Sequence, residues 1–256
     1  MLKSKKLLIT FIIALLVAAM PCMNAFASTL VWSDEFNGTS LSGSNWVYET
    51  GGGGWGNNEL ECYTNRTQNV SVSGGYLNIT ALKESYGGMN YTSGRIKTQG
   101  LHDWTYGTID ARIKIPTGQG LWPAFWMLGS NIGSVGWPQC GEMDIAEHVN
   151  TNTYNNGTMH WYNNGQADYG LTSGTLDFGQ FHDYQIQWNT NAIKWYVDGT
   201  LYCTGNIQNN INGTDAFHKP FFILFNLAVG GNWPGAPNGS TVFPATMQVD
   251  YVRVYQ

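Results

Sequence analysis

Polar and apolar residues alternate without a break in Thr108-Ile109-Asp110-Ala111-Arg112-Ile113-Lys114-Ile115. Successive side chains of a β-strand point to opposite faces, so this pattern predicts a strand with one buried and one solvent-exposed face. A helix has about 3.6 residues per turn and would scatter the same apolar residues around its axis. Residues 108–115 therefore predict a strand that covers a hydrophobic core.

The same period of two recurs along the chain. It covers residues 184–188 and 193–197 on either side of an Asn-rich turn, which predicts a β-hairpin. Further candidate strands cover residues 69–73, 76–83, 93–99, 122–128, 141–148, 155–162, 201–203, 219–228 and 246–255. Only Ile207 to Phe217 indicates a short helix. Many short strands separated by turn residues predict an all-β fold, a jelly-roll β-sandwich of two antiparallel sheets.

The first 27 residues have the features of a secretory signal peptide. Three lysines precede an apolar run from Leu7 to Met20, and Ala25-Phe26-Ala27 supplies a small-x-small signal for cleavage before Ser28. We expect residues 28–256 to form a single domain of an extracellular protein, since no repeat, linker or change of composition divides them. No other apolar run is long enough to span a bilayer.

Charge and cysteine content exclude two classes of function. The net charge is −5 and no basic patch is present, so nucleic acid is not an expected partner. Cys62, Cys140 and Cys203 follow the signal segment, which allows at most one disulfide and leaves its pairing open. None of these residues has the spacing of a zinc site.

Three carboxylates gather in Gly141-Glu142-Met143-Asp144-Ile145-Ala146-Glu147-His148, although only 11% of the residues are charged. In a regular strand, Glu142 and Asp144 share one face, whereas Glu147 points to the other. One extra residue, held in a β-bulge near positions 145 and 146, would return Glu147 to the face of the other two acids. The sequence therefore predicts a bulged strand with three acids on one face.

This bulged arrangement suits the hydrolysis of glycosidic bonds. At about 3.3 Å per residue, Glu142 and Glu147 lie roughly 13 Å apart along the backbone. Side chains that lean inward could bring their carboxyl groups to about 5–5.5 Å, the separation of a retaining glycosidase. Aromatic residues flank the acids at 121–128 and at Trp137, and aromatic rings stack on the apolar faces of sugars. A solvated acidic strand is the alternative, and such apolar neighbours disfavour it.

A close resemblance to the active-site signature of family 16 glycoside hydrolases lies in Trp137-Pro138-Gln139-Cys140-Gly141-Glu142-Met143-Asp144-Ile145-Ala146-Glu147. Its Glu-x-Asp-x-x-Glu spacing is typical of bacterial laminarinases, whereas lichenases usually lack the inserted residue. Other family landmarks follow in family order at residues 32–36, 55–59, 93–95, 121–126, 226–231 and 250–255. The resemblance implies a concanavalin A-like sandwich with a cleft on its concave face, and a secreted endo-β-1,3-glucanase that retains anomeric configuration.

The resemblance also implies a role for each acid. Glu142 would be the nucleophile that forms a covalent glycosyl-enzyme, Glu147 the general acid and base, and Asp144 the residue that orients Glu142. Neighbouring negative charges raise the pKa of one member of such a cluster and keep it protonated near neutral pH. Catalysis then requires no cofactor.

Contacts with a β-glucan chain follow from the same resemblance. The matching residues offer indole rings for stacking, and amide, guanidinium or imidazole groups for sugar hydroxyls. They are Asn58, Arg95, Trp122, Trp126, Trp137, His160, Asn226 and Trp233. Each of three has an ordinary alternative: Trp126 a place in the core, Arg95 a surface ion pair, and His160 a strand position without function.

Members of the family often carry a structural Ca²⁺ on the convex side. The matching positions are Glu35, Gly75 and Asp250, whose ordinary reading is that of polar groups at strand ends. We expect a monomer whose partner is a β-glucan polysaccharide. Two other functions stay open: a β-1,3-1,4-glucanase, and a non-catalytic glucan-binding lectin, whose known relatives have lost catalytic Glu residues.

Overall fold

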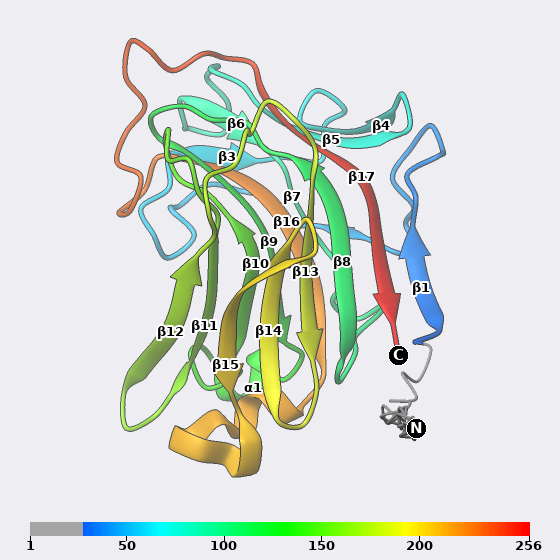
Figure 1. The fold of residues 1–256 in the computed structure, drawn as a ribbon. Coiled ribbons are helices and arrows are strands. Elements are labelled where there is room, and N and C mark those ends of the chain that lie inside the picture. Colours follow the sequence, from blue (N-terminus) through cyan, green and yellow to red (C-terminus); the bar gives the residue numbers. More distant parts are fainter. Residues whose placement is uncertain (1–27) are drawn as a thin grey trace, which may run out of the picture.

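The computed structural model describes residues 28–256, which form two large antiparallel sheets packed face to face (Figure 1). The predicted signal peptide, residues 1–27, lies outside the described residues. The predicted all-β sandwich is confirmed. Among residues 28–256, no helix has the length and apolar character needed to cross a membrane.

One sheet has eight strands. In spatial order they are β15 (Thr200–Asn206), β14 (Ala192–Val197), β13 (His182–Trp188), β8 (Gly107–Lys114), β17 (Ala245–Tyr255), β5 (Tyr76–Ala81) and β4 (Val70–Ser73), while β1 (Leu30–Asp34) pairs with β17. The predicted hairpin is β13 and β14, paired in register from Tyr184 opposite Val197 to Trp188 opposite Ile193.

The other sheet has seven strands and carries the functional site. Its spatial order is β12 (Gln166–Thr172), β11 (Asn156–Tyr162), β10 (Glu142–Glu147), β9 (Leu121–Gly129), β16 (Phe221–Val229), β7 (Arg95–Lys97) and β2 (Val47–Tyr48). A small parallel pair, β3 (Glu61–Tyr63) and β6 (Tyr91–Ser93), lies beside these strands. Two short helices complete the fold, α1 (Ile132–Val135) and the 3₁₀ segment η1 (Gln208–His218).

The hydrophobic core lies between the two sheets. Ile109, Ala111 and Ile113 of β8 are fully buried, as their alternation predicts. From the opposite sheet, Phe125 and Phe225 enter the same core and stack with ring centroids 4.7 Å apart. Since one face of the seven-stranded sheet meets this core, its other face is available for a ligand.

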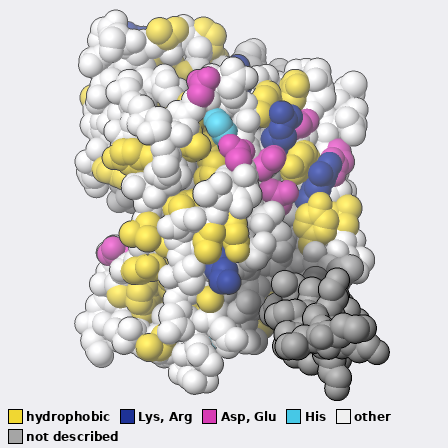
Figure 2. All heavy atoms as spheres, in the orientation of Figure 1, with side chains coloured by type: hydrophobic (Ala, Val, Ile, Leu, Met, Phe, Trp, Pro, Cys, Tyr) yellow, Lys and Arg dark blue, Asp and Glu magenta, His cyan; other side chains and the backbone are white. Residues whose placement is uncertain are grey.

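Charged side chains gather on the outer face of the eight-stranded sheet. Figure 2 shows acidic and basic groups interspersed over β8, β13 and β17. Two ion pairs contribute, Arg112 with Asp250 and Arg253 with Glu35. This face therefore differs in chemistry from the cleft face, where the carboxylates are flanked mainly by indoles.

The predicted strand at 93–99 is wrong as a single element. The chain passes from β6 into β7 at Gly94, where an added Cβ would lie 2.3 Å from the Val70 side chain. The predicted helix at 207–217 is a 3₁₀ segment, interrupted where Asn209, Asn210 and Asn212 have left-handed backbone angles that no continuous right-handed helix accommodates. Helix α1 has only four residues, too few for a periodic signal.

Candidate active site

The predicted bulge lies at Ile145. Asp144 pairs opposite Trp126 and Ala146 opposite Phe125, so Ile145 is the extra residue of β10. Glu147 then pairs opposite Ala124, two positions from Trp126. This returns Glu147 to the face of Glu142 and Asp144, and all three acids line one cleft.

The cleft has a volume of about 670 Å³ and lies over β9, β10, β11 and β16. Its two most exposed indoles, Trp137 and Trp233, are 45% and 47% exposed. Trp137 forms a hydrogen bond with Glu142 at the start of β10. Trp233 packs edge-on against Trp122 of β9, whose indole bonds Glu147 at the end of β10. The acids thus lie between two accessible aromatic surfaces.

Indole N–H groups hold the two outer acids. Trp137 Nε1 donates to Glu142 Oε2 at 2.9 Å, and Trp122 Nε1 donates to Glu147 Oε1 at 2.9 Å. An indole N–H can only donate, so each bond favours the ionised carboxylate while leaving its second oxygen free. Both glutamates therefore keep one oxygen for chemistry.

Asp144 lies between the glutamates and is 3% exposed. Its Oδ2 is 3.2 Å from His160 Nε2, although the two atoms lack the alignment of a hydrogen bond. Trp195 Nε1 donates to its main-chain oxygen at 2.7 Å and anchors the strand from the core side. Asp144 is thus fixed in the floor of the cleft.

Burial is the main cause of the perturbed pKa values in this cluster. It raises the pKa of Glu142 and of Glu147 above the usual range, and the charge of Asp144 adds to both shifts. Burial also raises the pKa of Asp144. The indole bonds and His160 oppose these shifts. The substrate-free cleft therefore retains protons on this cluster at pH values where isolated carboxyls have lost them.

Seven of the eight predicted substrate residues line the cleft: Arg95, Trp122, Trp126, Trp137, His160, Asn226 and Trp233. Trp126 faces the cleft and donates through Nε1 to Asn226 Oδ1 at 2.7 Å. Arg95 forms an ion pair with Glu49 and lies 4.9 Å from the centroids of the Trp55 and Trp126 rings, while its contact with a sugar stays a prediction.

Asn58 does not line the cleft. Its Nδ2 donates to Asn232 Oδ1 at 2.9 Å and joins two exposed loops. Its φ of 57° places it in the left-handed region, which Asn tolerates better than most residues. The structure therefore gives Asn58 a role in shaping the rim beside the cleft-lining residues 55–57, and its contact with a substrate stays a prediction.

Other residues line the cleft that the sequence did not single out. They are Trp55, Glu59, Gln166 and Asp168, together with smaller side chains. Glu59 and Trp55 belong to the loop 55–59, which was recognised only as a family landmark. Gln166 and Asp168 belong to β12, an edge strand whose mixed residues carry no apolar alternation. No periodic signal marks them.

The two carboxylates predicted to bind calcium form ion pairs with arginines in the structure. Both carboxylate oxygens of Glu35 accept from Arg253, at 2.9 and 2.7 Å, and Asp250 Oδ2 accepts from Arg112 at 2.6 Å. A guanidinium on the same oxygens repels a cation. The side-chain carboxylates therefore do not fit a calcium site as they lie, and Ca²⁺ stays a prediction that depends on main-chain oxygens.

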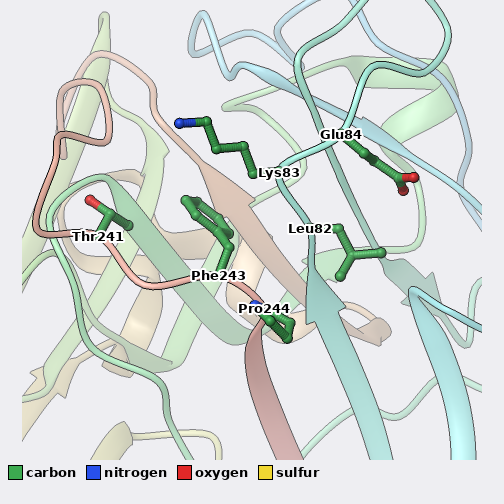
Figure 3. Close-up of a pocket in the computed structure, with 6 residues that line it drawn as sticks. All are labelled: Leu82, Lys83, Glu84, Thr241, Phe243 and Pro244. Atoms are coloured by element: carbon green, nitrogen blue, oxygen red, sulfur yellow. The ribbon is translucent and has the colours of Figure 1, made fainter.

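A second cavity of about 440 Å³ lies between residues 82–84, after β5, and residues 241–244, before β17 (Figure 3). Glu84, one of its lining residues, is held by Arg66 and Thr92. The free cysteines Cys62, Cys140 and Cys203 are all buried. Neither feature brings a group of acids together as β10 does.

An open cleft with clustered carboxyls and accessible indoles on a β-sandwich defines a carbohydrate-active protein. The family model of glycosyl hydrolases family 16 matches residues 57–253, and the chain belongs to this family. It is 42% identical to a β-glucanase of Rhodothermus marinus over 89% of this chain and 85% of that protein.

Two further relatives place the chain within the family. It is 46% identical to the clotting factor G alpha subunit of Tachypleus tridentatus over 94% of this chain, but spans only 36% of that longer protein. The catalytic domain of an endo-1,3-beta-glucanase (laminarinase) from Thermotoga petrophila superposes with a TM-score of 0.80 at 42% identity, over 90% of this chain and 98% of that domain.

Proposed function

We propose that this chain is a secreted, retaining endo-β-1,3-glucanase that hydrolyses β-1,3-glucans such as laminarin. The observation that carries this proposal is the bulge at Ile145, which holds Glu142, Asp144 and Glu147 on one cleft face. The names of the Rhodothermus and Thermotoga relatives support β-glucan as the substrate class. The signal-like segment at residues 1–27 supports secretion.

The reaction proceeds in two displacements. Glu142 attacks the anomeric carbon, while Glu147 donates its proton to the glycosidic oxygen and the leaving chain departs. Glu147 then removes a proton from water, which attacks the glycosyl-enzyme and releases the sugar with its original configuration. Burial and the charge of Asp144 raise the pKa of Glu147, which lets it hold a proton for the first step. The same causes act on Glu142, so the assignment of the two roles rests on the family signature.

Asp144 acts on Glu142. It is the most deeply buried of the three acids. Burial raises its pKa, and its charge raises the pKa of Glu142, so the two carboxyls cannot both ionise at low cost and retain a proton between them. A protonated Asp144 can donate a hydrogen bond to a neighbouring carboxylate, which a second carboxylate cannot do. Asp144 therefore orients the nucleophile and lowers the cost of placing its charge in the cleft.

Exposed indoles at both sides of the acids suit a long polymer. Trp137 and Trp233 offer ring faces on either side of β10, as an enzyme that cuts within a chain requires. A β-1,3-1,4-glucanase is the second candidate, because the same cleft accommodates β-linked glucose of either linkage. We also propose that the enzyme acts as a monomer.

The linkage proposal is tested on a panel of laminarin, lichenan and barley β-glucan. We expect reducing ends to be released fastest from laminarin, with short β-1,3-linked oligosaccharides as products. Rapid hydrolysis of lichenan with negligible action on laminarin would establish the mixed-linkage alternative. Binding to laminarin without hydrolysis of any of the three glucans would establish a lectin.

A further inference from the structure

A second pair of carboxyl groups lies beneath the cleft, outside the catalytic cluster. Glu61 of β3 is fully buried and Glu59 is 5% exposed. The Glu59 carboxyl lies within hydrogen-bonding reach of Glu61 and lines the cleft. Two buried carboxyls in contact cannot both be ionised at low cost, so the pair needs either a cation or a shared proton.

The cationic side chain near the pair, Arg95, already forms an ion pair with another glutamate. Arg95 of β7 is bonded to Glu49 and lies over two indole rings. Glu61 Oε2 accepts from the Val229 main-chain N–H at 2.6 Å, while its Oε1 has no hydrogen-bond partner among residues 28–256. A proton on that oxygen would donate to Glu59. Because burial raises the pKa of Glu61, Glu61 is the protonated member of the pair.

A chain of hydrogen bonds links Trp126 to Glu59, and its donors and acceptors can be arranged in only one order. Trp126 Nε1 can only donate, so Asn226 must turn Oδ1 towards it and Nδ2 towards Tyr63. The Tyr63 hydroxyl accepts from Asn226 Nδ2 at 3.1 Å and therefore sends its own proton to Glu59 Oε2 at 3.0 Å. The chain ends at Glu59, which must be an acceptor.

Removal of the charge on Glu59 would weaken this order of donors and acceptors. Without an ionised acceptor, the Tyr63 hydroxyl loses its charge-assisted bond and no longer holds the Asn226 amide from below, so the bond from Trp126 is left to hold its orientation. Asn226 is 6% exposed and lines the cleft, and its Oδ1 has a second lone pair available for a sugar hydroxyl. The protonation state of Glu59 and Glu61 therefore affects Asn226, a residue that lines the cleft.

We propose that Glu59 and Glu61 share one proton, and that ionised Glu59 acts through Tyr63 to fix the amide of Asn226 as an acceptor for a glucan hydroxyl. Glu59, Glu61 and Tyr63 are positioning residues in this arrangement. The inference rests on the proposed function for its ligand, a β-linked glucose unit, and adds a group of residues that orient the cleft from below.

A double-mutant cycle tests the coupling between Tyr63 and Asn226. Tyr63→Phe keeps the ring and removes the hydroxyl, so we expect KM to rise about threefold to tenfold, with a smaller change in kcat. Added to Asn226→Ala, the same change should have little further effect, because its target is gone. Full additivity of the two effects would overturn the inference. Tyr76→Phe, whose ring stacks on Phe181, is the matched control.

The two glutamates give an asymmetric comparison. Glu59→Gln and Glu61→Gln have nearly the same shape, but only the first removes the ionised acceptor. We expect Glu59→Gln to raise KM several-fold more than Glu61→Gln, because a Gln at 61 can still donate to Glu59. Equal effects of the two substitutions would show a packing role alone and would contradict the proposal.

The pH dependence of stability provides a readout that needs no substrate. Burial, and then the charge of Glu59, raise the pKa of Glu61, so the folded state holds a proton that the unfolded chain releases above about pH 4.5. Wild-type stability therefore falls as pH rises through this range, and Glu61→Gln removes the loss. The other titratable or charged groups around the pair are Tyr63, Tyr91 opposite Glu61 on β6, and Arg95.

We expect the Tm of Glu61→Gln to exceed that of the wild type by a margin that grows with pH above about 4.5. A margin that is constant with pH would overturn the shared proton. This result stands whichever glucan is cleaved, whereas a wild-type protein that cleaves no glucan at all would overturn the proposed function and leave the melting comparison intact.

Discussion

At the scale of single residues, Asp144 shows how the site obtains its acid–base properties. The aspartate is 3% exposed, beside two glutamates and a histidine. Because burial raises its pKa, the folded protein binds a proton there that the unfolded chain releases. Stability conferred by this proton is present at low pH and is lost as pH rises through the shifted pKa. The site therefore costs the fold stability at neutral pH.

Replacement of Asp144 by Asn should remove this cost. We expect the Tm of Asp144→Asn to exceed that of the wild type by a margin that increases above about pH 4, while kcat falls because Glu142 loses its titrating neighbour. Thermal melting across a pH series measures the first effect. Asp103→Asn removes an exposed charge and is the control. A lower Tm for Asp144→Asn at neutral pH would contradict the proposed origin of the shift.

The sequence predicts the placement of the three acids on one face well, and the positions of the polar residues around them less well. Glu142, Asp144 and Glu147 stand out because charge is rare in this chain and strand phase relates them. Glu59 gives no such signal, since a single acid in a loop has no periodicity. Asn58 was expected to contact the substrate, and the structure instead joins its amide to Asn232. Side-chain direction in loops depends on long-range contacts that local patterns do not contain.

At the scale of elements, the bulge in β10 decides which residues face the cleft. Ile145 is fully buried and adds one residue without changing the position of Glu147 opposite Ala124. Strand phase alone predicted this irregularity, because three acids cannot otherwise share a face. By contrast, the short strands β2, β3 and β6 were not predicted, since two or three residues are too few to show alternation.

Deletion and insertion at the bulge should have opposite consequences. Deletion of Ile145 leaves an unbulged strand with the acids still in phase, so we expect measurable glucanase activity, with stability lowered by about 2–5 kcal/mol for the lost buried side chain. Insertion of one Ala after Ile145 puts the following glutamate four positions after Asp144. If the bulge persists, this glutamate points to the core, and if the strand becomes regular, it shifts along β9 to lie opposite Trp122. Both arrangements take the carboxyl away from Glu142 and should abolish activity. Hydrolysis assays on folded variants measure both. An active insertion variant with an inactive deletion variant would contradict the account.

At the scale of the whole molecule, the two sheets have different roles. The eight-stranded sheet closes the core and carries charged groups on its outer face (Figures 1 and 2). The seven-stranded sheet presents the cleft. This division was predictable in outline, because alternating strands with one wet face imply a sandwich. The order of strands within each sheet was not, since it depends on pairings between distant residues.

The predicted calcium ion belongs to this outer face and has a melting test. If Ca²⁺ binds near Glu35, Gly75 and Asp250, EDTA should lower the Tm and added Ca²⁺ should restore it, by binding only the folded state. Such an ion would have to displace Arg112 or Arg253 or use main-chain oxygens. An unchanged Tm, with no calcium found by elemental analysis, would leave the arginine pairs as the stabilising contacts of this face.

The retaining mechanism on Glu142 is tested most directly by azide rescue of Glu142→Ala. With dinitrophenyl β-laminaribioside as substrate, we expect the variant to lose on the order of 10⁴-fold in kcat and to regain turnover in azide. Its product should be the α-glycosyl azide, because azide enters the space left by the nucleophile. Glu147→Ala is the matched control and should give the β-glycosyl azide through the intact Glu142. Unimpaired hydrolysis by Glu142→Ala, or a β-azide from it, would contradict the assignment of Glu142 as the nucleophile.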